Sequence, residues 1–126
     1  MADNRLAWLI YIVDIDRRFT GAAKSAFKGR GGAVLMTGGG LAKHPSGNYA
    51  MLSLSKAALL NVSEGMHASM ASEGIHLATI TVNDYIPPGS DKAVAVAEHF
   101  WAAQTQPQDQ WTWEVSYPEE WMLVGM

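Results

Sequence analysis

Apolar residues along this chain gather in blocks that alternate between extended and helical spacing. The run Ala33–Thr37 is short and continuously apolar, which is typical of a strand buried on both faces, and Gly38-Gly39-Gly40 is expected to end it. Residues Ile75–Val82 form a second run, rich in β-branched side chains. Residues 111–117 alternate in polarity and predict a third strand, with Trp111 and Trp113 on one face.

Helical spacing separates these runs. Residues 46–72 predict a long helix with Ser46 as its N-cap and Gly74 beyond its end. A helix over 91–105 follows, capped by Ser90 and stopped by Pro107. Residues 5–27 predict a first helix, although the run Trp8–Val13 fits a strand equally well.

The order of these elements predicts the fold class. Strands that alternate with helices favour a parallel sheet with helices on its faces. We therefore expect an α/β protein, a three-layer partial Rossmann-like domain with about three strands and about three helices, formed by residues 1–126 as a single domain. In such a narrow sheet the apolar strand 33–37 has an exposed edge, which we expect another strand or another chain to cover.

Composition narrows the range of partners. The net charge of −3 and the absence of a basic run argue against nucleic acid and against an anionic membrane surface. The chain has no cysteine, which excludes disulfides and thiolate metal sites and favours a cytoplasmic location. Charged residues make up only 17% of the chain, which indicates apolar surface that a partner covers.

Three segments resemble the C-terminal half of the short-chain dehydrogenase/reductase family. They are Gly-Gly-Ala-Val-Leu-Met-Thr at 31–37, Ser-Lys-Ala-Ala-Leu at 55–59 and Glu-Gly-Ile-His-Leu-Ala-Thr-Ile-Thr-Val at 73–82. The resemblance covers residues 20–116 and implies the family's fifth strand, active-site helix and sixth strand. It also implies that the N-terminal half, which holds NAD or NADP on a glycine-rich turn, is absent from this sequence.

The resemblance gives only part of the family's catalytic set. Lys56 matches the active-site lysine, which holds the cofactor ribose and lowers the pKa of a tyrosine four residues earlier. Leu52 stands at that tyrosine's position and cannot transfer a proton. The family's substrate-orienting serine falls on Gly38 or Gly39, and Asn83-Asp84 replaces its Pro-Gly after the sixth strand.

Tyr49 is the remaining candidate for an acid near Lys56, because it lies seven residues earlier on a similar helix face. The alternative for Tyr49 is a structural side chain with its hydroxyl hydrogen-bonded, and for Lys56 a lysine with a packed stem and a solvated amine. No metal site is expected, because none of the four histidines lies at ligand spacing from another.

These observations leave three hypotheses. In the first, the protein is short-chain dehydrogenase/reductase-like, has no independent catalytic activity and persists as a self-associating half-domain, a homodimer through the helices 5–27 and 46–72. In the second, it is an NAD(P)-dependent oxidoreductase that uses Lys56 and a non-standard proton donor, with NAD or NADP bound at Lys56. In the third, it is a degenerate or truncated gene product without selected chemistry.

Overall fold

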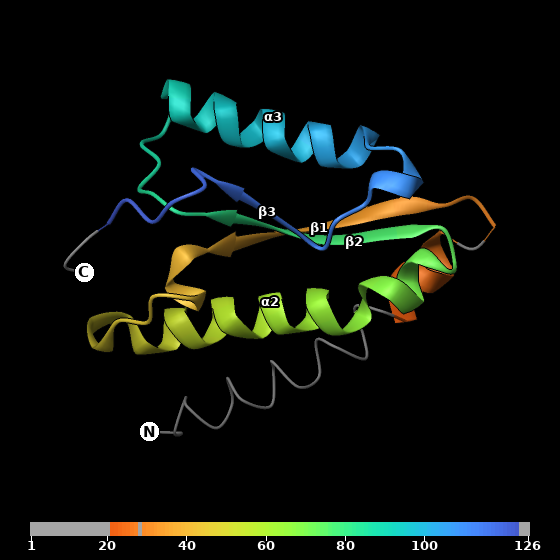
Figure 1. The fold of residues 1–126 in the computed structure, drawn as a ribbon, viewed down its shortest axis with the longest axis horizontal. Coiled ribbons are helices and arrows are strands. Elements are labelled where there is room, and N and C mark those ends of the chain that lie inside the picture. The colour runs from red at the N-terminus through yellow and green to blue at the C-terminus, as the bar shows by residue number, and fades with distance from the viewer. Residues whose placement is uncertain (1–20, 28, 124–126) are drawn as a thin grey trace.

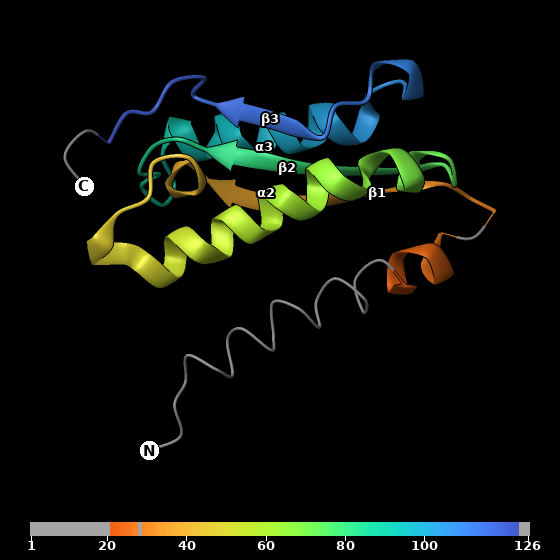
Figure 2. The ribbon, with the colours of Figure 1, turned by 60° about the horizontal axis from the view of Figure 1, so that its bottom comes forward.

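A computed structural model describes residues 21–27 and 29–123 as three layers (Figure 1). Strands β1 (Gly32–Gly39), β2 (Ile75–Val82) and β3 (Glu114–Tyr117) form a parallel sheet in the order β1-β2-β3. Helix α2 (Ala50–Ala71) covers one face and α3 (Asp91–Thr105) covers the other (Figures 1 and 2). The predicted α/β fold with a small parallel sheet is confirmed.

Strand β1 is longer than predicted. Gly38 and Gly39 continue the ladder, where they pair with Thr81 and Val82 of β2, so the strand ends inside the glycine run, at Gly39, rather than before it. A Cβ atom on Gly38 would lie 2.4 Å from the Cγ2 atom of Thr79. A side chain at Gly38 would therefore collide with β2, and a pattern based on β-propensity cannot anticipate this close packing.

Strand β3 is shorter than predicted, because a 3-10 turn at Gln108–Gln110 carries Trp111 out of the sheet. The Trp111 ring stacks on His76, whose Nδ1 lies 3.1 Å from the carbonyl oxygen of Ala103 in α3. The Trp113 ring instead lies 6.4 Å from that of His67 in α2. The prediction that both tryptophans share one face is wrong, because they pack against opposite layers.

The two described helices differ in how they start. Ser90 caps α3 as predicted, since its Oγ accepts a hydrogen bond from the Ala93 N–H at 3.2 Å. Ser46 was expected to cap the helix 46–72, but residues Gly47–Tyr49 form a 3-10 turn and α2 begins at Ala50. The Ser46 side chain makes no capping hydrogen bond. The backbone N–H of Ser46 donates to Ser53 Oγ.

The remaining boundaries match the sequence pattern. Strand β2 and helix α3 begin and end where predicted, and Gly74 adopts a left-handed φ of 76° in the turn after α2. Residues 21–26 are helical, whereas the rest of the predicted helix 5–27, including the choice between helix and strand at 8–13, lies outside the described residues.

The core lies between the sheet and α2. Ile75 and Leu77 of β2 pack with Met36 of β1, Met70 of α2 and Ala23. One polar contact is buried in this layer, a short hydrogen bond between Ser63 of α2 and Thr79 of β2. Because both hydroxyls are satisfied, this pair fixes the position of α2 against β2 without leaving an unpaired polar group.

Two further properties concern the described residues alone. Neither α2 nor α3 combines the length and the apolar character that a bilayer crossing requires. Within 21–27 and 29–123, no three side chains of the histidine, aspartate and glutamate types come together as a metal-binding group.

Candidate functional site

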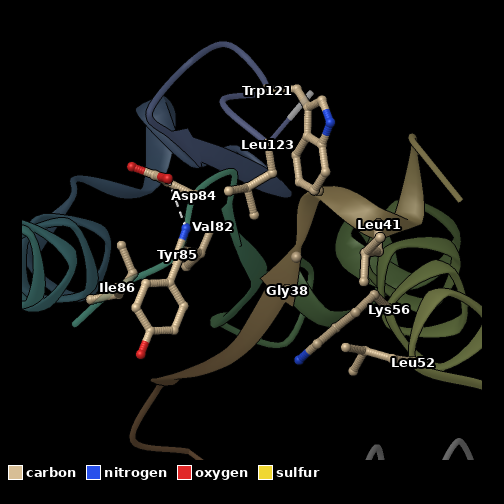
Figure 3. Close-up of a pocket in the computed structure, with 12 residues that line it drawn as sticks. Gly38, Leu41, Leu52, Lys56, Val82, Asp84, Tyr85, Ile86, Trp121 and Leu123 are labelled. Carbon is tan, nitrogen blue, oxygen red and sulfur yellow. Dashed lines mark hydrogen bonds between the residues drawn. The ribbon is translucent and has the colours of Figure 1, made fainter. Parts of the chain in front are cut away.

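An open pocket of about 250 Å³ lies where β1 and β2 end. In parallel α/β sheets, ligands bind outside the carboxyl ends of the strands, so this is the expected place for a site. The lining comes from the end of β1, the start of α2, the loop after β2 and the C-terminal segment: Gly38, Gly39, Gly40, Leu41, Leu52, Lys56, Val82, Asp84, Tyr85, Ile86, Trp121 and Leu123 (Figure 3).

Gly40 allows the C-terminal segment to close one side of this pocket. A Cβ atom on Gly40 would lie 2.2 Å from the Trp121 ring and 2.6 Å from the Asn83 side-chain oxygen. The indole therefore rests directly on the backbone that follows β1. His44 stacks on the same indole, with ring centroids 5.2 Å apart and planes 14° apart. Trp121 is thus held between the backbone at Gly40 and the His44 ring.

Asn83 anchors the segment that carries Trp121. This side chain is buried at the end of β2, and its Nδ2 donates to the carbonyl oxygens of Pro118 at 2.8 Å and Glu119 at 3.4 Å. The Asn83 carbonyl oxygen accepts from the Met122 N–H at 3.0 Å. Asn83 therefore binds the C-terminal segment through both its side chain and its backbone.

Among the described residues that line the pocket, Lys56 alone carries a side-chain amine. Its stem carbons pass close to Gly39, and its Nζ donates to the Thr37 carbonyl oxygen at 2.9 Å. Figure 3 shows the amine pointing away from α2 into the space between Leu52 and Tyr85. Burial lowers the pKa of the Lys56 amine below its usual value, because the low-dielectric surroundings disfavour the charged form.

Asp84 carries the one carboxylate that the described residues bring to the lining, and both of its oxygens already accept hydrogen bonds. Its Oδ2 accepts a short hydrogen bond from Lys92 of α3, and its Oδ1 accepts from the Tyr85 N–H at 2.8 Å. The hydrogen bond from Lys92 contributes most to lowering the pKa of Asp84 below its usual range. The carboxylate thus points to α3 and its own loop.

The residues proposed from the sequence are only partly brought together. Lys56 and Leu52 line the pocket one helical turn apart, and Gly38 and Gly39 form its floor with backbone atoms. Tyr49 does not line it: the side chain is 47% exposed, and its hydroxyl has no hydrogen-bond partner among the described residues. The bonded hydroxyl expected for Tyr49 is therefore absent from this part of the structure.

Sequence reasoning did not single out Tyr85 and Trp121. Tyr85 lies in the loop after β2, and the rule that ligands bind at the carboxyl ends of parallel strands would have included it. Trp121 belongs to a segment whose sequence shows no periodicity. Its place at the site depends on contacts with distant residues, such as the packing of its ring on Gly40.

A comparison with solved structures gives one informative match. A short-chain dehydrogenase from Rhodopseudomonas palustris superposes with a TM-score of 0.57 at 26% identity. The match covers 68% of this chain and 37% of that chain, so the present chain is similar to little more than a third of the dehydrogenase. The fold is short-chain dehydrogenase-like. No protein-family model and no curated protein matches the sequence.

A short-chain dehydrogenase-like fold raises the question of whether a nicotinamide dinucleotide fits here. The pocket formed by the described residues does not accommodate this cofactor. Its volume of about 250 Å³ lies below the range of roughly 300–1,000 Å³ that is usual for larger ligands. Strand β1 is followed by a three-residue 3-10 turn at Gly40–Ala42, so no helix N-terminus faces the pocket to bind a pyrophosphate. We therefore derive no hydride-transfer step from these residues.

Proposed function

We propose that the protein is a short-chain dehydrogenase-like half-domain that has no dehydrogenase activity of its own and acts through self-association. One observation carries the first part of the proposal. At the family's proton-donor position the pocket wall presents the aliphatic side chain of Leu52, one turn before Lys56. An aliphatic group neither donates nor accepts a proton, so the Lys56 amine has no acid to activate there.

The surface of α2 supports self-association. Four large side chains at the start of this helix are strongly exposed, and we call them the apolar α2 surface: Tyr49 at 47%, Met51 at 37%, Leu52 at 46% and Leu54 at 42%. Apolar residues grouped in this way mark interaction sites more often than scattered ones do. The commonest arrangement that would cover the surface is a two-fold homodimer. The predicted contribution of residues 5–27 to the dimer lies mainly outside the described residues.

The alternative, an NAD(P)-dependent oxidoreductase with a non-standard proton donor, is favoured by one feature. Tyr85 brings a phenol to the pocket that also holds Lys56. This alternative needs a nucleotide site beyond the described pocket, because the cofactor does not fit there. For the self-associating half-domain we also propose a cytoplasmic location, which the absence of cysteine favours.

The test combines activity, cofactor binding and oligomeric state in the full chain. We expect no oxidation of NADH or NADPH above a protein-free control with a panel of aldehydes and ketones. We also expect no change in melting temperature with NAD, NADH, NADP or NADPH. A ligand at a hundred times its Kd would stabilise the protein by about 2.7 kcal/mol, which such a scan detects.

Two outcomes would contradict the proposal. Turnover that disappears in Lys56→Ala would establish the oxidoreductase, and Tyr85→Phe would then test the phenol as its acid. A monomer by light scattering at micromolar concentration would exclude self-association.

A further inference from the structure

The Lys56 amine differs from the other described lysines in its electrostatic surroundings. Lys24, Lys43 and Lys92 each form an ion pair with a carboxylate: Glu73, Glu114 and Asp84. Within the described residues, the only hydrogen-bond acceptor for Lys56 Nζ is the neutral carbonyl oxygen of Thr37. An ion pair stabilises the ammonium form, whereas a neutral acceptor in an apolar pocket does so much less.

The described part of the pocket wall also offers no free counter-ion for Lys56. Asp84 is the one acidic side chain in the lining, and its oxygens are bonded to Lys92 and to the Tyr85 N–H. The rest of the wall consists of glycine backbone and of aliphatic or aromatic side chains, Leu41, Leu52, Val82, Ile86, Trp121 and Leu123 among them. A neutral amine in this place can donate one N–H to Thr37 and still direct its lone pair into the pocket.

We propose that Lys56 captures small aldehydes with an apolar chain by forming a reversible imine in this pocket. The Nζ lone pair attacks the carbonyl carbon, and the carbonyl oxygen takes up a proton while the nitrogen loses one. The resulting carbinolamine loses water, so that amine and aldehyde give imine and water without any oxidation or reduction. Desolvated lysines in hydrophobic pockets are activated for this step, and the lowered pKa of Lys56 agrees with it.

The pocket determines the class of aldehyde. A volume of about 250 Å³ accepts a short chain rather than a large molecule. The aliphatic and indole surfaces favour an alkyl chain over a hydroxylated one, because burial of apolar area is the main source of affinity there. We therefore expect butanal to react faster than glycolaldehyde at Lys56. The proposal does not depend on self-association or on the absence of dehydrogenase activity.

The experiment treats the full chain with butanal and cyanoborohydride, which reduces an imine to a stable alkyl-lysine. Peptide mapping by mass spectrometry then compares alkylation at Lys56 with that at Lys43, Lys92 and the chain's α-amino group. We expect Lys56 to be alkylated several-fold faster than Lys43 and Lys92, because its amine faces an apolar wall and lacks a carboxylate partner among the described residues. Glycolaldehyde, which gains less from the apolar wall, is expected to reduce this preference without abolishing it.

A matched pair of variants tests the role of the pocket. Leu52→Glu places a carboxylate one turn from Lys56 on the pocket wall, and we expect about tenfold slower alkylation at Lys56, because the ammonium form gains a partner. Leu54→Glu is the control, since Leu54 is similarly exposed on α2 but does not line this pocket. Both variants add the same charge to α2, and light scattering shows whether either one changes the oligomeric state.

Two results would overturn the proposal. One is alkylation of Lys56 at the same rate as Lys43 and Lys92 in the folded chain. The other is equal Lys56 alkylation in Leu52→Glu and Leu54→Glu when circular dichroism shows that both are folded. Lys56→Arg, which keeps a donor for Thr37 but forms no alkyl-lysine, identifies the modified peptide.

Discussion

Asp84 links the loop after β2 to α3 by accepting one hydrogen bond with each carboxylate oxygen. These contacts lower the pKa of Asp84, and the Lys92 hydrogen bond contributes most. A carboxylate whose pKa is lowered by folding contributes stability above its unfolded pKa of about 3.9 and loses it as the pH falls through the folded value. The contribution of Asp84 is therefore complete at neutral pH and disappears in acid.

We predict that Asp84→Asn lowers the melting temperature at pH 7 and that the difference from the wild type narrows below about pH 4. The amide can still accept from the Tyr85 N–H, but the charge that holds Lys92 is lost. Thermal scans from pH 3 to pH 8 measure the difference. Asp109→Asn is the control, because Asp109 forms no ion pair with another described residue. A difference that stays constant down to pH 3 would disprove the assignment.

At the residue scale, the sequence identified Lys56 and Leu52, which both line the pocket, but not the contacts between distant segments. Lys56 could be found from its Ser-Lys-Ala-Ala-Leu setting, and the leucine at the proton-donor position follows from counting. The role of Gly40 could not be found, because it depends on the Trp121 ring, which lies far along the chain. Contacts between distant segments leave no periodic trace in the pattern of apolar residues.

At the scale of elements, His76 connects three of them. Its ring is buried in β2, with Nδ1 at 3.1 Å from the Ala103 oxygen of α3 and Nε2 at 2.8 Å from the Thr112 oxygen before β3. It also stacks on Trp111 with centroids 4.8 Å apart. A single side chain thus positions α3 and the start of β3 relative to β2.

We predict that His76→Ala lowers the free energy of unfolding by about 2–4 kcal/mol, because it leaves a cavity beneath Trp111 and removes the ring N–H that donates to a backbone carbonyl group. Urea denaturation followed by tryptophan fluorescence measures the loss. His67→Ala is the comparison, since that ring is only partly buried and tilted against Trp113. Its cost should be about 1 kcal/mol. Equal losses in the two variants would show that His76 is not the connecting residue.

The elements with correct boundaries have local stop signals. Ser90 and Pro107 limit α3, and Gly74 separates α2 from β2. The boundaries that were wrong follow 3-10 turns that lie beside tertiary contacts: Trp111 follows Gln108–Gln110 and stacks on His76, and α2 follows Gly47–Tyr49, next to the bond from the Ser46 backbone N–H to Ser53. The intrinsic propensity of a residue for helix or strand does not include contacts with residues far away in the sequence.

At the scale of the whole molecule, two features favour association between copies. The apolar α2 surface is exposed, and the described part of the sheet leaves the outer edge of β1 without a neighbouring strand. Strand β1 contains no charged residue and no proline that would discourage pairing at this edge.

We predict that Met51→Glu combined with Leu54→Glu shifts the protein from dimer to monomer at micromolar concentration, with a Kd increase of about a hundredfold or more for two buried apolar residues. Light scattering coupled to size exclusion measures the shift. Asn61→Glu is the control, because it adds charge at an exposed position of α2 outside the apolar α2 surface. A dimer that survives the double substitution would place the interface elsewhere.

The pocket takes its walls from distant parts of the chain, with Gly38 and Lys56 in the first half and Trp121 and Leu123 near the other end. The ribosome delivers these parts in order, at about 5–20 residues per second. Until Trp121 has left the exit tunnel, Lys56 stands in a groove whose indole wall is missing. These walls are therefore complete only after synthesis has passed Trp121, and a ligand that needs the indole distinguishes chains on either side of that point.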